Sequence, residues 1–88
     1  MTPSIGRIVH YTLSEFDADA IQARRTEAGT VANTAAGGQI FPAVVVRTFG
    51  GSGANLRVLL DGDDTYWATS RTEGEPGANG QWCWPPRV

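Results

Sequence analysis

The side chains in this sequence with the greatest capacity for chemistry are large aromatic rings and arginines. Guanidinium groups bind phosphates through paired hydrogen bonds, and aromatic rings stack on nucleobases. Trp82 and Trp84 are two residues apart in a strand-like segment, so they should share one face of it. These residue types together predict a site for a planar base with attached phosphate groups. The residues expected to form this site are Tyr11, Arg47, Arg57, Trp67, Arg71, Trp82 and Trp84.

The same residues also have a second interpretation. A small domain can place its Trp and Tyr rings in the core or between subunits, because these residues are enriched in protein interfaces. The arginines would then be solvated surface groups. All seven cations of the chain are arginine, and a GC-rich genome produces the same bias through its codons. The arginine content alone therefore does not identify a ligand.

Motifs for catalysis or metal binding are missing. His10 is the single histidine and Cys83 the single cysteine, so a site needing two of either residue cannot form. The segment 61–64 lacks the ligand spacing and closing glutamate of an EF-hand loop and is typical of a hairpin turn. The glycines of 50–53 are not followed by the Lys and Ser or Thr of a phosphate-binding loop. We therefore expect no enzymatic activity, no cofactor and no metal site.

Hydrophobic patterning predicts five short strands and one helix. Strands are expected where β-branched and aromatic residues concentrate, and turns where Gly, Pro and Asp cluster. Ser14 and Asp17 have the spacing of a capping box, which predicts a helix start. The order of elements predicts one mainly β domain over 1–88, a small SH3-like barrel of about five antiparallel strands with one inserted helix. The expected strands are 7–13, 40–49, 55–61, 65–71 and 81–84, and the expected helix is 15–27.

Alternation within these segments predicts the orientation of several side chains. Leu56, Val58 and Leu60 should face the core, because successive strand residues point to opposite sides. Phe16 and Ile21 fall on the helix stripe that is expected to pack on the domain.

Size and charge limit the class of protein. A chain of 88 residues forms one domain with a thin core, so its aromatic residues favour a homo-oligomer. The net charge of −2 argues against nucleic acid as a partner. A single cysteine excludes an internal disulfide, no segment has the pattern of a signal peptide, and the apolar stretch 41–46 is too short to span a bilayer. These features predict a cytoplasmic protein that does not enter membranes.

Four segments resemble a group of small proteins encoded by tailed bacteriophages of actinobacteria. The most distinctive is the ending Trp-x-Trp-Pro-Pro-Arg. The resemblance covers most of the chain except the loop 30–38 and the turn 50–54, and it brings no catalytic residues with it. It implies a role in the host bacterial cytoplasm, where many small phage proteins counter host defence. The segments are 5–12, 41–47, 60–70 and 82–87.

One class of anti-defence proteins, the nucleotide sponges, suggests a specific role. Sponges are small homo-oligomers that enclose an immune signal, such as a cyclic dinucleotide or a cyclic ADP-ribose relative, without turning it over. The leading hypothesis is therefore sequestration of a small nucleotide signal. The alternative is an SH3-like protein-interaction module that docks on a host or phage protein through the Trp82 and Trp84 face. A nucleic-acid-binding role and a structural role in the virion are further alternatives.

Overall fold

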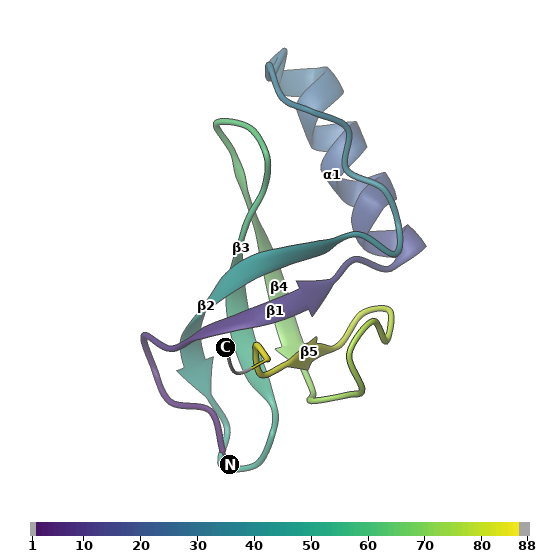
Figure 1. Ribbon diagram of the computed structural model, residues 1–88. Helices are drawn as coiled ribbons and strands as arrows, with labels where there is room; N and C mark the ends of the chain where they lie inside the picture. The colour runs from purple at the N-terminus through teal and green to yellow at the C-terminus, as the bar shows by residue number, and fades with distance from the viewer. Residues whose placement is uncertain (1, 87–88) are drawn as a thin grey trace.

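The fold is a five-stranded antiparallel sheet with one helix beside it (Figure 1), in a computed structural model that describes residues 2–86. The strands are hydrogen-bonded in the order β4-β3-β2-β1-β5. All five expected strands and the inserted helix are present, which confirms a mainly β domain with one helix. Along the chain the elements are β1 (Ile8–Thr12), α1 (Glu15–Ala28), β2 (Ile40–Thr48), β3 (Ala54–Leu59), β4 (Thr65–Arg71) and β5 (Trp82–Cys83).

The sheet is open, so the predicted closure into an SH3-like barrel is not confirmed. Closure requires a continuous ladder between the two ends of the sheet, and β4 and β5 are not neighbours in it. The segment that follows β4 pairs with β5 at a single position, an isolated parallel bridge between Glu73 and Trp82. β5 is only two residues long, and Pro85 and Pro86 follow soon after it. Proline has no N–H to donate to a ladder, so these residues prevent a longer closing strand.

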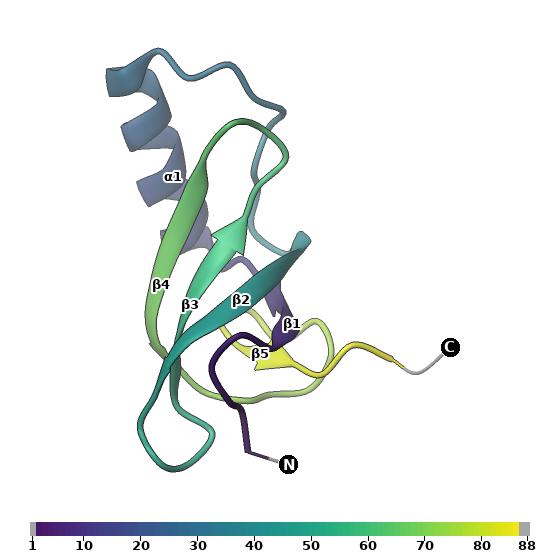
Figure 2. The ribbon, with the colours of Figure 1, turned by 90° about the vertical axis from the view of Figure 1, so that its left-hand side faces the viewer.

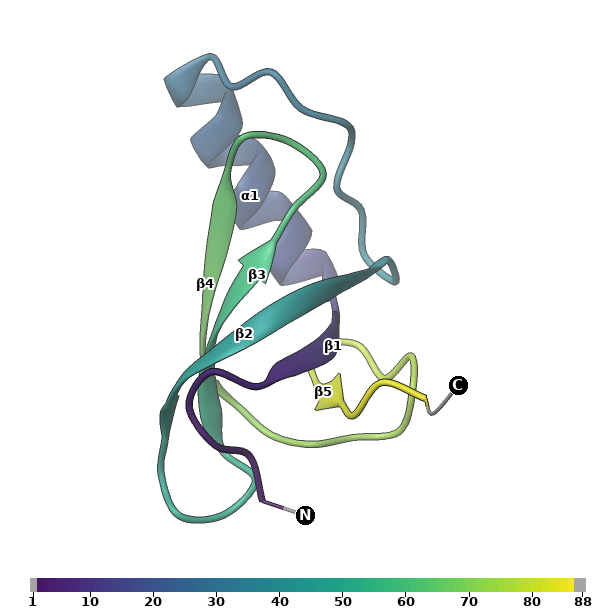
Figure 3. The same cartoon turned by 60° about the vertical axis from the view of Figure 1, so that its left-hand side comes forward.

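The helix lies alongside the β3–β4 hairpin on one side of the sheet (Figures 2 and 3). Its N-terminus has the predicted capping box between Ser14 and Asp17, and it ends at Gly29, whose φ of 67° is left-handed. No helix formed by residues 2–86 is long and apolar enough to cross a membrane.

The helix turns a partly polar stripe toward the sheet. Ile21 is buried as expected, but the prediction for Phe16 is wrong, because its side chain is 73% exposed. Asp17 and Arg25 are both buried, and each lies about one turn from Ile21 along the same stripe of the helix. Arg25 pairs with Asp64 of the β3–β4 turn at 2.8 Å. The inward position of Asp17 rotates its neighbour Phe16 toward solvent.

The core lies on the inner face of the sheet, which we define as the side that carries the buried strand residues. Leu56, Val58 and Leu60 all point into it, as the alternation predicted. Trp82 is fully buried there, and its indole N–H donates to the Ser52 carbonyl at 2.9 Å. The other side of the sheet, the outer face, carries the intervening residues of the same strands.

Candidate functional site

The three arginines expected to hold phosphate lie on neighbouring strands, but on different faces of the sheet. Arg47 is in β2, Arg57 in β3 and Arg71 in β4. The pairing of β2 with β3 and the pairing of β4 with β3 each contain a register shift, and these shifts lie next to Arg47 and Arg71. An extra residue in one strand reverses its side-chain alternation beyond that point. The direction of two of the three arginines therefore depends on a β-bulge.

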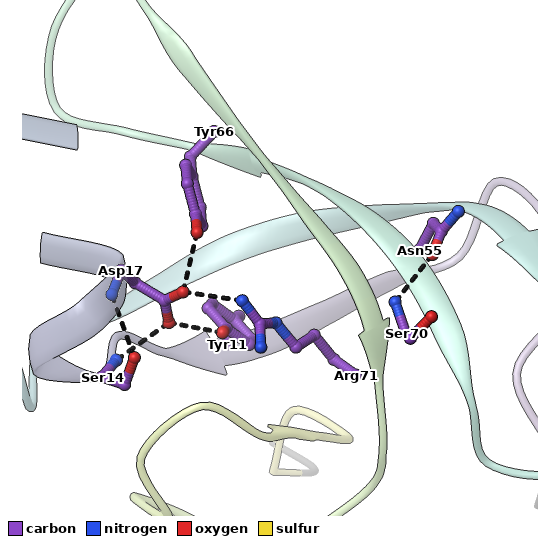
Figure 4. Close-up of polar contacts among 7 residues, drawn as sticks. All are labelled: Tyr11, Ser14, Asp17, Asn55, Tyr66, Ser70 and Arg71. Atoms are coloured by element: carbon purple, nitrogen blue, oxygen red, sulfur yellow. Dashed lines mark hydrogen bonds and ion pairs between the residues drawn. The ribbon is translucent and has the colours of Figure 1, made fainter. Parts of the chain in front are cut away.

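The bulge in β4 turns Arg71 inward. Arg71 pairs with Ala54 and Ala68 pairs with Leu56, so β4 has one residue more than β3 between these pairs. Ser70 lies in the bulge with a left-handed φ of 54°, and its N–H donates to the Asn55 side-chain oxygen at 2.7 Å (Figure 4). Without the extra residue, Arg71 would follow the outward phase of Trp67 and Thr69.

The bulge in β2 has the opposite effect on Arg47. Val45 pairs with Leu56 and Arg47 pairs with Asn55, which leaves Val46 as the extra residue. Directly opposite residues of an antiparallel ladder share a face. Arg47 therefore joins Asn55 on the outer face, where its guanidinium lies 5.6 Å from the centre of the Phe49 ring.

Arg71 ends in a buried cluster around Asp17, shown in Figure 4. Asp17 has no exposed surface. Its carboxylate accepts hydrogen bonds from the Tyr11 hydroxyl at 2.5 Å, the Tyr66 hydroxyl at 2.9 Å and the Arg71 guanidinium at 2.8 Å. The Ser14 backbone N–H donates to it at 2.9 Å. Four donors from β1, β4 and the helix start thus converge on one carboxylate.

The cluster holds Asp17 as an anion and its tyrosines as neutral donors. Burial favours the neutral carboxyl, but the hydrogen bonds from the Ser14 backbone, Tyr11 and Tyr66 outweigh it and lower the pKa of Asp17. Burial and the hydrogen bond to Asp17 raise the pKa of both Tyr11 and Tyr66. A satisfied anion of this kind clamps the helix to the sheet. Tyr11 is therefore a structural group that cannot stack on a base, and Arg71, whose side chain is 25% exposed, is engaged through one guanidinium nitrogen by Asp17.

Trp82 is likewise a core residue, so its expected contact with a ligand is not possible in this conformation. Its Cα partner in β1 is the buried Tyr11. Trp84 packs edge-on against it, with ring centroids 5.3 Å apart and an interplanar angle of 86°. Trp82 and Trp84 do lie together as expected, but Trp84 alone of the two lines a surface pocket.

The outer face brings Arg57 and Trp67 together. They are directly opposite in the β3–β4 ladder, and the row continues through Val44 of β2 to Ile8 of β1. Trp67 is 52% exposed, and Ile8 and Arg57 are also exposed. None of the nine acidic residues, all of which lie within 2–86, belongs to a strand. Arg57 and Arg47 therefore project from a face whose own strands carry no compensating carboxylate.

A pocket of about 290 Å³ lies at the β1–β5 end of the sheet. His10 and Cys83 are Cα partners in the β1–β5 ladder, so their side chains share its floor. The Arg7 guanidinium lies 5.1 Å from the centre of the Trp84 ring. Arg87, which completes the ending motif, lies outside the described residues. The pocket is lined by His10, Ile40, Pro76, Cys83, Trp84 and Pro86.

His10, Cys83 and Arg7 were not among the residues expected to form a site. The alternation of the two strands could have indicated them, because His10 is the neighbour of Tyr11 and Cys83 is the neighbour of Trp82, so His10 and Cys83 point away from the face that carries Tyr11 and Trp82. Each pair of neighbours alternates between core and outer face. Recognising the pocket would have required the pairing of the first and last strands, which their sequences do not reveal.

The pocket chemistry suits binding better than nucleophilic attack. Burial and the nearby charge of Glu73 raise the pKa of Cys83 above its ordinary value, so the thiol is protonated at neutral pH. A thiol in this state is a weak nucleophile and a weak hydrogen-bond donor. Among residues 2–86, no three His, Cys, Asp or Glu side chains are grouped so as to hold a metal ion.

Comparison of the chain with protein-family models, with curated proteins and with solved structures found no match. The site is therefore defined by its own geometry. It consists of the outer face, with the Arg57–Trp67 pair toward one edge and the Trp84 pocket toward the other.

Proposed function

We propose that this protein is a non-enzymatic binding protein that sequesters a small anionic nucleotide on the outer face of its sheet. The observation that supports this proposal is the pairing of exposed Trp67 with Arg57 on strands that contain no acidic residue. An aromatic ring beside a guanidinium provides a stacking surface and a partner for phosphate. The resemblance to actinobacterial phage proteins suggests that the nucleotide is a host immune signal of the cyclic dinucleotide or cyclic ADP-ribose type.

In this proposal the expected residues have unequal roles. Trp67 would stack on the base, and Arg57 and Arg47 would contact phosphate oxygens. Tyr11, Arg71 and Trp82 would act only indirectly, because they are buried or engaged beneath the sheet. An open sheet face encloses little of a ligand, so we propose that a second subunit of a homo-oligomer covers it. The protein would act in the cytoplasm of the infected bacterium, where such signals diffuse.

The weak nucleophilicity of Cys83 supports binding without turnover. The buried Asp17 also supports it, because four donors already satisfy this carboxylate and it has no exposed surface. A general base must reach the proton that it removes, and Asp17 reaches only its own donors.

Native mass spectrometry of the purified protein with a panel of cyclic dinucleotides and ADP-ribose-type signals tests the proposal. We expect an oligomer that retains one of these nucleotides intact and releases it unchanged on denaturation. Trp67→Ala or Arg57→Ala should weaken binding by about tenfold, since stacking on one ring contributes ~1–3 kcal/mol. Arg24→Ala is the matched control, because it removes an exposed arginine of the helix.

Two results would contradict the proposal. A chemically altered nucleotide after release would indicate turnover. Failure to retain any member of the panel, by a protein shown to be folded, would remove nucleotide sequestration.

A second candidate function is docking on a host or phage protein. The observation that favours it is the mostly apolar pocket of Trp84, Pro76 and Pro86, which lies beside exposed Ile8. The meander β2–β3–β4 followed by a short last strand also follows the strand order of SH3-like barrels. As part of this second proposal, we propose that the domain is a relative of these barrels with an open sheet. A pull-down from host lysate would support it if Trp84→Ala reduced capture of one identified protein and no nucleotide co-purified.

A further inference from the structure

We propose that the pocket at the β1–β5 end of the sheet is a second base-binding subsite, separate from the Trp67 position at the opposite edge, with the phosphate of this second nucleotide directed toward Arg7. This inference rests on the proposed function and adds to it a second nucleotide position and the orientation of its base. It also adds three residues that were not among those expected to form a site, His10, Cys83 and Arg7.

The walls of the pocket suit a flat ring. Its volume of about 290 Å³ is at the lower end of the range for small-ligand pockets, which are mostly apolar with a few polar groups. The Trp84 indole, Ile40 and two prolines supply apolar surface. The Trp84 ring packs at 86° against the buried Trp82, and this contact favours one ring orientation before a ligand arrives.

The polar groups of the pocket suit the edge of a base. His10 and Cys83 are partners across the β1–β5 ladder, so both side chains lie on the same face. A neutral imidazole has one donor and one acceptor, and a protonated thiol is a weak donor. The edge of a nucleobase carries both donors and acceptors. The pair therefore complements a base more closely than it complements a purely apolar ring.

Charge around the pocket sets the direction of the phosphate. Arg7 is exposed and lies over the same Trp84 ring that lines the pocket. Glu73 forms a backbone bridge with Trp82, the residue before Cys83, and its charge acts on the thiol. A phosphate next to Glu73 would be repelled, whereas a phosphate beside Arg7 would gain paired hydrogen bonds. The base should therefore enter with its sugar and phosphate on the Arg7 side.

Cys83 provides a direct test, because it is the single thiol of the chain. The experiment measures the rate of its alkylation by N-ethylmaleimide in the intact protein, with and without the same nucleotide panel at saturating concentration. A base in the pocket covers the thiol and only the unoccupied fraction reacts, so we expect alkylation to slow by about tenfold when the nucleotide is present at about ten times its Kd. Ribose 5-phosphate, which carries a phosphate but no base, should leave the rate unchanged. Cys83→Ser should show no labelling in any condition.

Two variants separate the base contact from the phosphate contact. His10→Ala should weaken nucleotide binding and leave the weak binding of ribose 5-phosphate unchanged, whereas Arg7→Ala should weaken both. Because His10 is only partly buried, its removal should preserve the fold, which thermal unfolding would verify. Binding of a nucleotide that leaves both Cys83 alkylation and the His10→Ala affinity unchanged would overturn the base subsite but keep the proposed function. Failure of every nucleotide to bind would overturn both.

Discussion

Arg57 and Arg71 lie on neighbouring strands of one sheet, and yet they have different roles. Arg71 is drawn under the sheet, where it pairs with the buried Asp17 at 2.8 Å. Arg57 projects from the opposite face beside the exposed Trp67. The position of one bulge residue, Ser70, separates the two outcomes. Residue type and strand order therefore do not define a phosphate site, because a single inserted residue decides whether an arginine supports the fold or faces a ligand.

The largest expected effect is the difference in the free energy of unfolding between the Arg71→Ala and Arg57→Ala variants. Arg71→Ala leaves the buried Asp17 without its cation, and breaking a buried pair in this way costs about 3–5 kcal/mol. Arg57→Ala removes a surface charge and should change stability by no more than about 0.5 kcal/mol. Urea unfolding followed by Trp fluorescence measures both. Equal destabilisation by the two changes would show that the inner cluster contributes no more than the outer face.

Acid should weaken the inner face and leave the outer face unaffected. The pKa of Asp17 is lower in the folded protein than its ordinary value of 3.8, so its contribution to stability is complete above that value. This contribution is lost as the pH falls through the folded pKa, because the unfolded chain binds the proton more readily. The free energy of unfolding should therefore decline below about pH 4. Asp64, whose pKa the Arg25 side chain also lowers, adds a decline of the same sign.

Asp17→Asn is the control for this pH dependence. The variant should be less stable at neutral pH and should show a shallower decline in acid, measured by thermal unfolding at a series of pH values. A decline as steep as that of the unmodified protein would assign the acid sensitivity to other carboxylates.

Ser70→Gly should give the smallest effect, and it should be stabilising. A non-glycine residue in the left-handed region costs about 1–2 kcal/mol, which glycine avoids. Part of that gain is offset by the greater freedom of glycine in the unfolded chain, so we expect a net increase of about 0.5–1 kcal/mol. Differential scanning calorimetry would detect it as a higher Tm. A loss of stability would mean that the Ser70 side chain, rather than its backbone geometry, maintains the bulge.

Local patterns in the sequence predicted much of the fold. The β-branched and aromatic segments became the five strands, and Ser14 and Asp17 formed the expected capping box. Leu56 and Val58 alternated into the core as predicted. These features depend on neighbouring residues, so a single sequence can reveal them. Closure of the barrel depends on distant strands, and here the two prolines after β5 prevented it.

The candidate site was less predictable because it depends on pairing between strands. Neither Val46 nor Ser70 has a residue type that marks a bulge, and yet these two positions decide where Arg47 and Arg71 point. The inward turn of Asp17 was hidden for a related reason. An acidic residue in the first helical turn is ordinarily a solvated cap, and its burial here is favourable because the Ser14 N–H, the hydroxyls of Tyr11 and Tyr66 and the Arg71 guanidinium all donate to it.

The buried charges of the helix also constrain the order of folding. Asp17 contacts a residue 54 positions later in the chain, and Arg25 contacts a residue 39 positions later. Their partners, Arg71 and Asp64, belong to the β3–β4 hairpin and its turn, so these contacts cannot form until that hairpin has closed. Closing such long loops is slow relative to forming one helical turn or one hairpin. The helix can form early from its cap, but we expect it to dock only after the hairpin has closed, when Asp17 and Arg25 meet their partners as Ile21 enters the core.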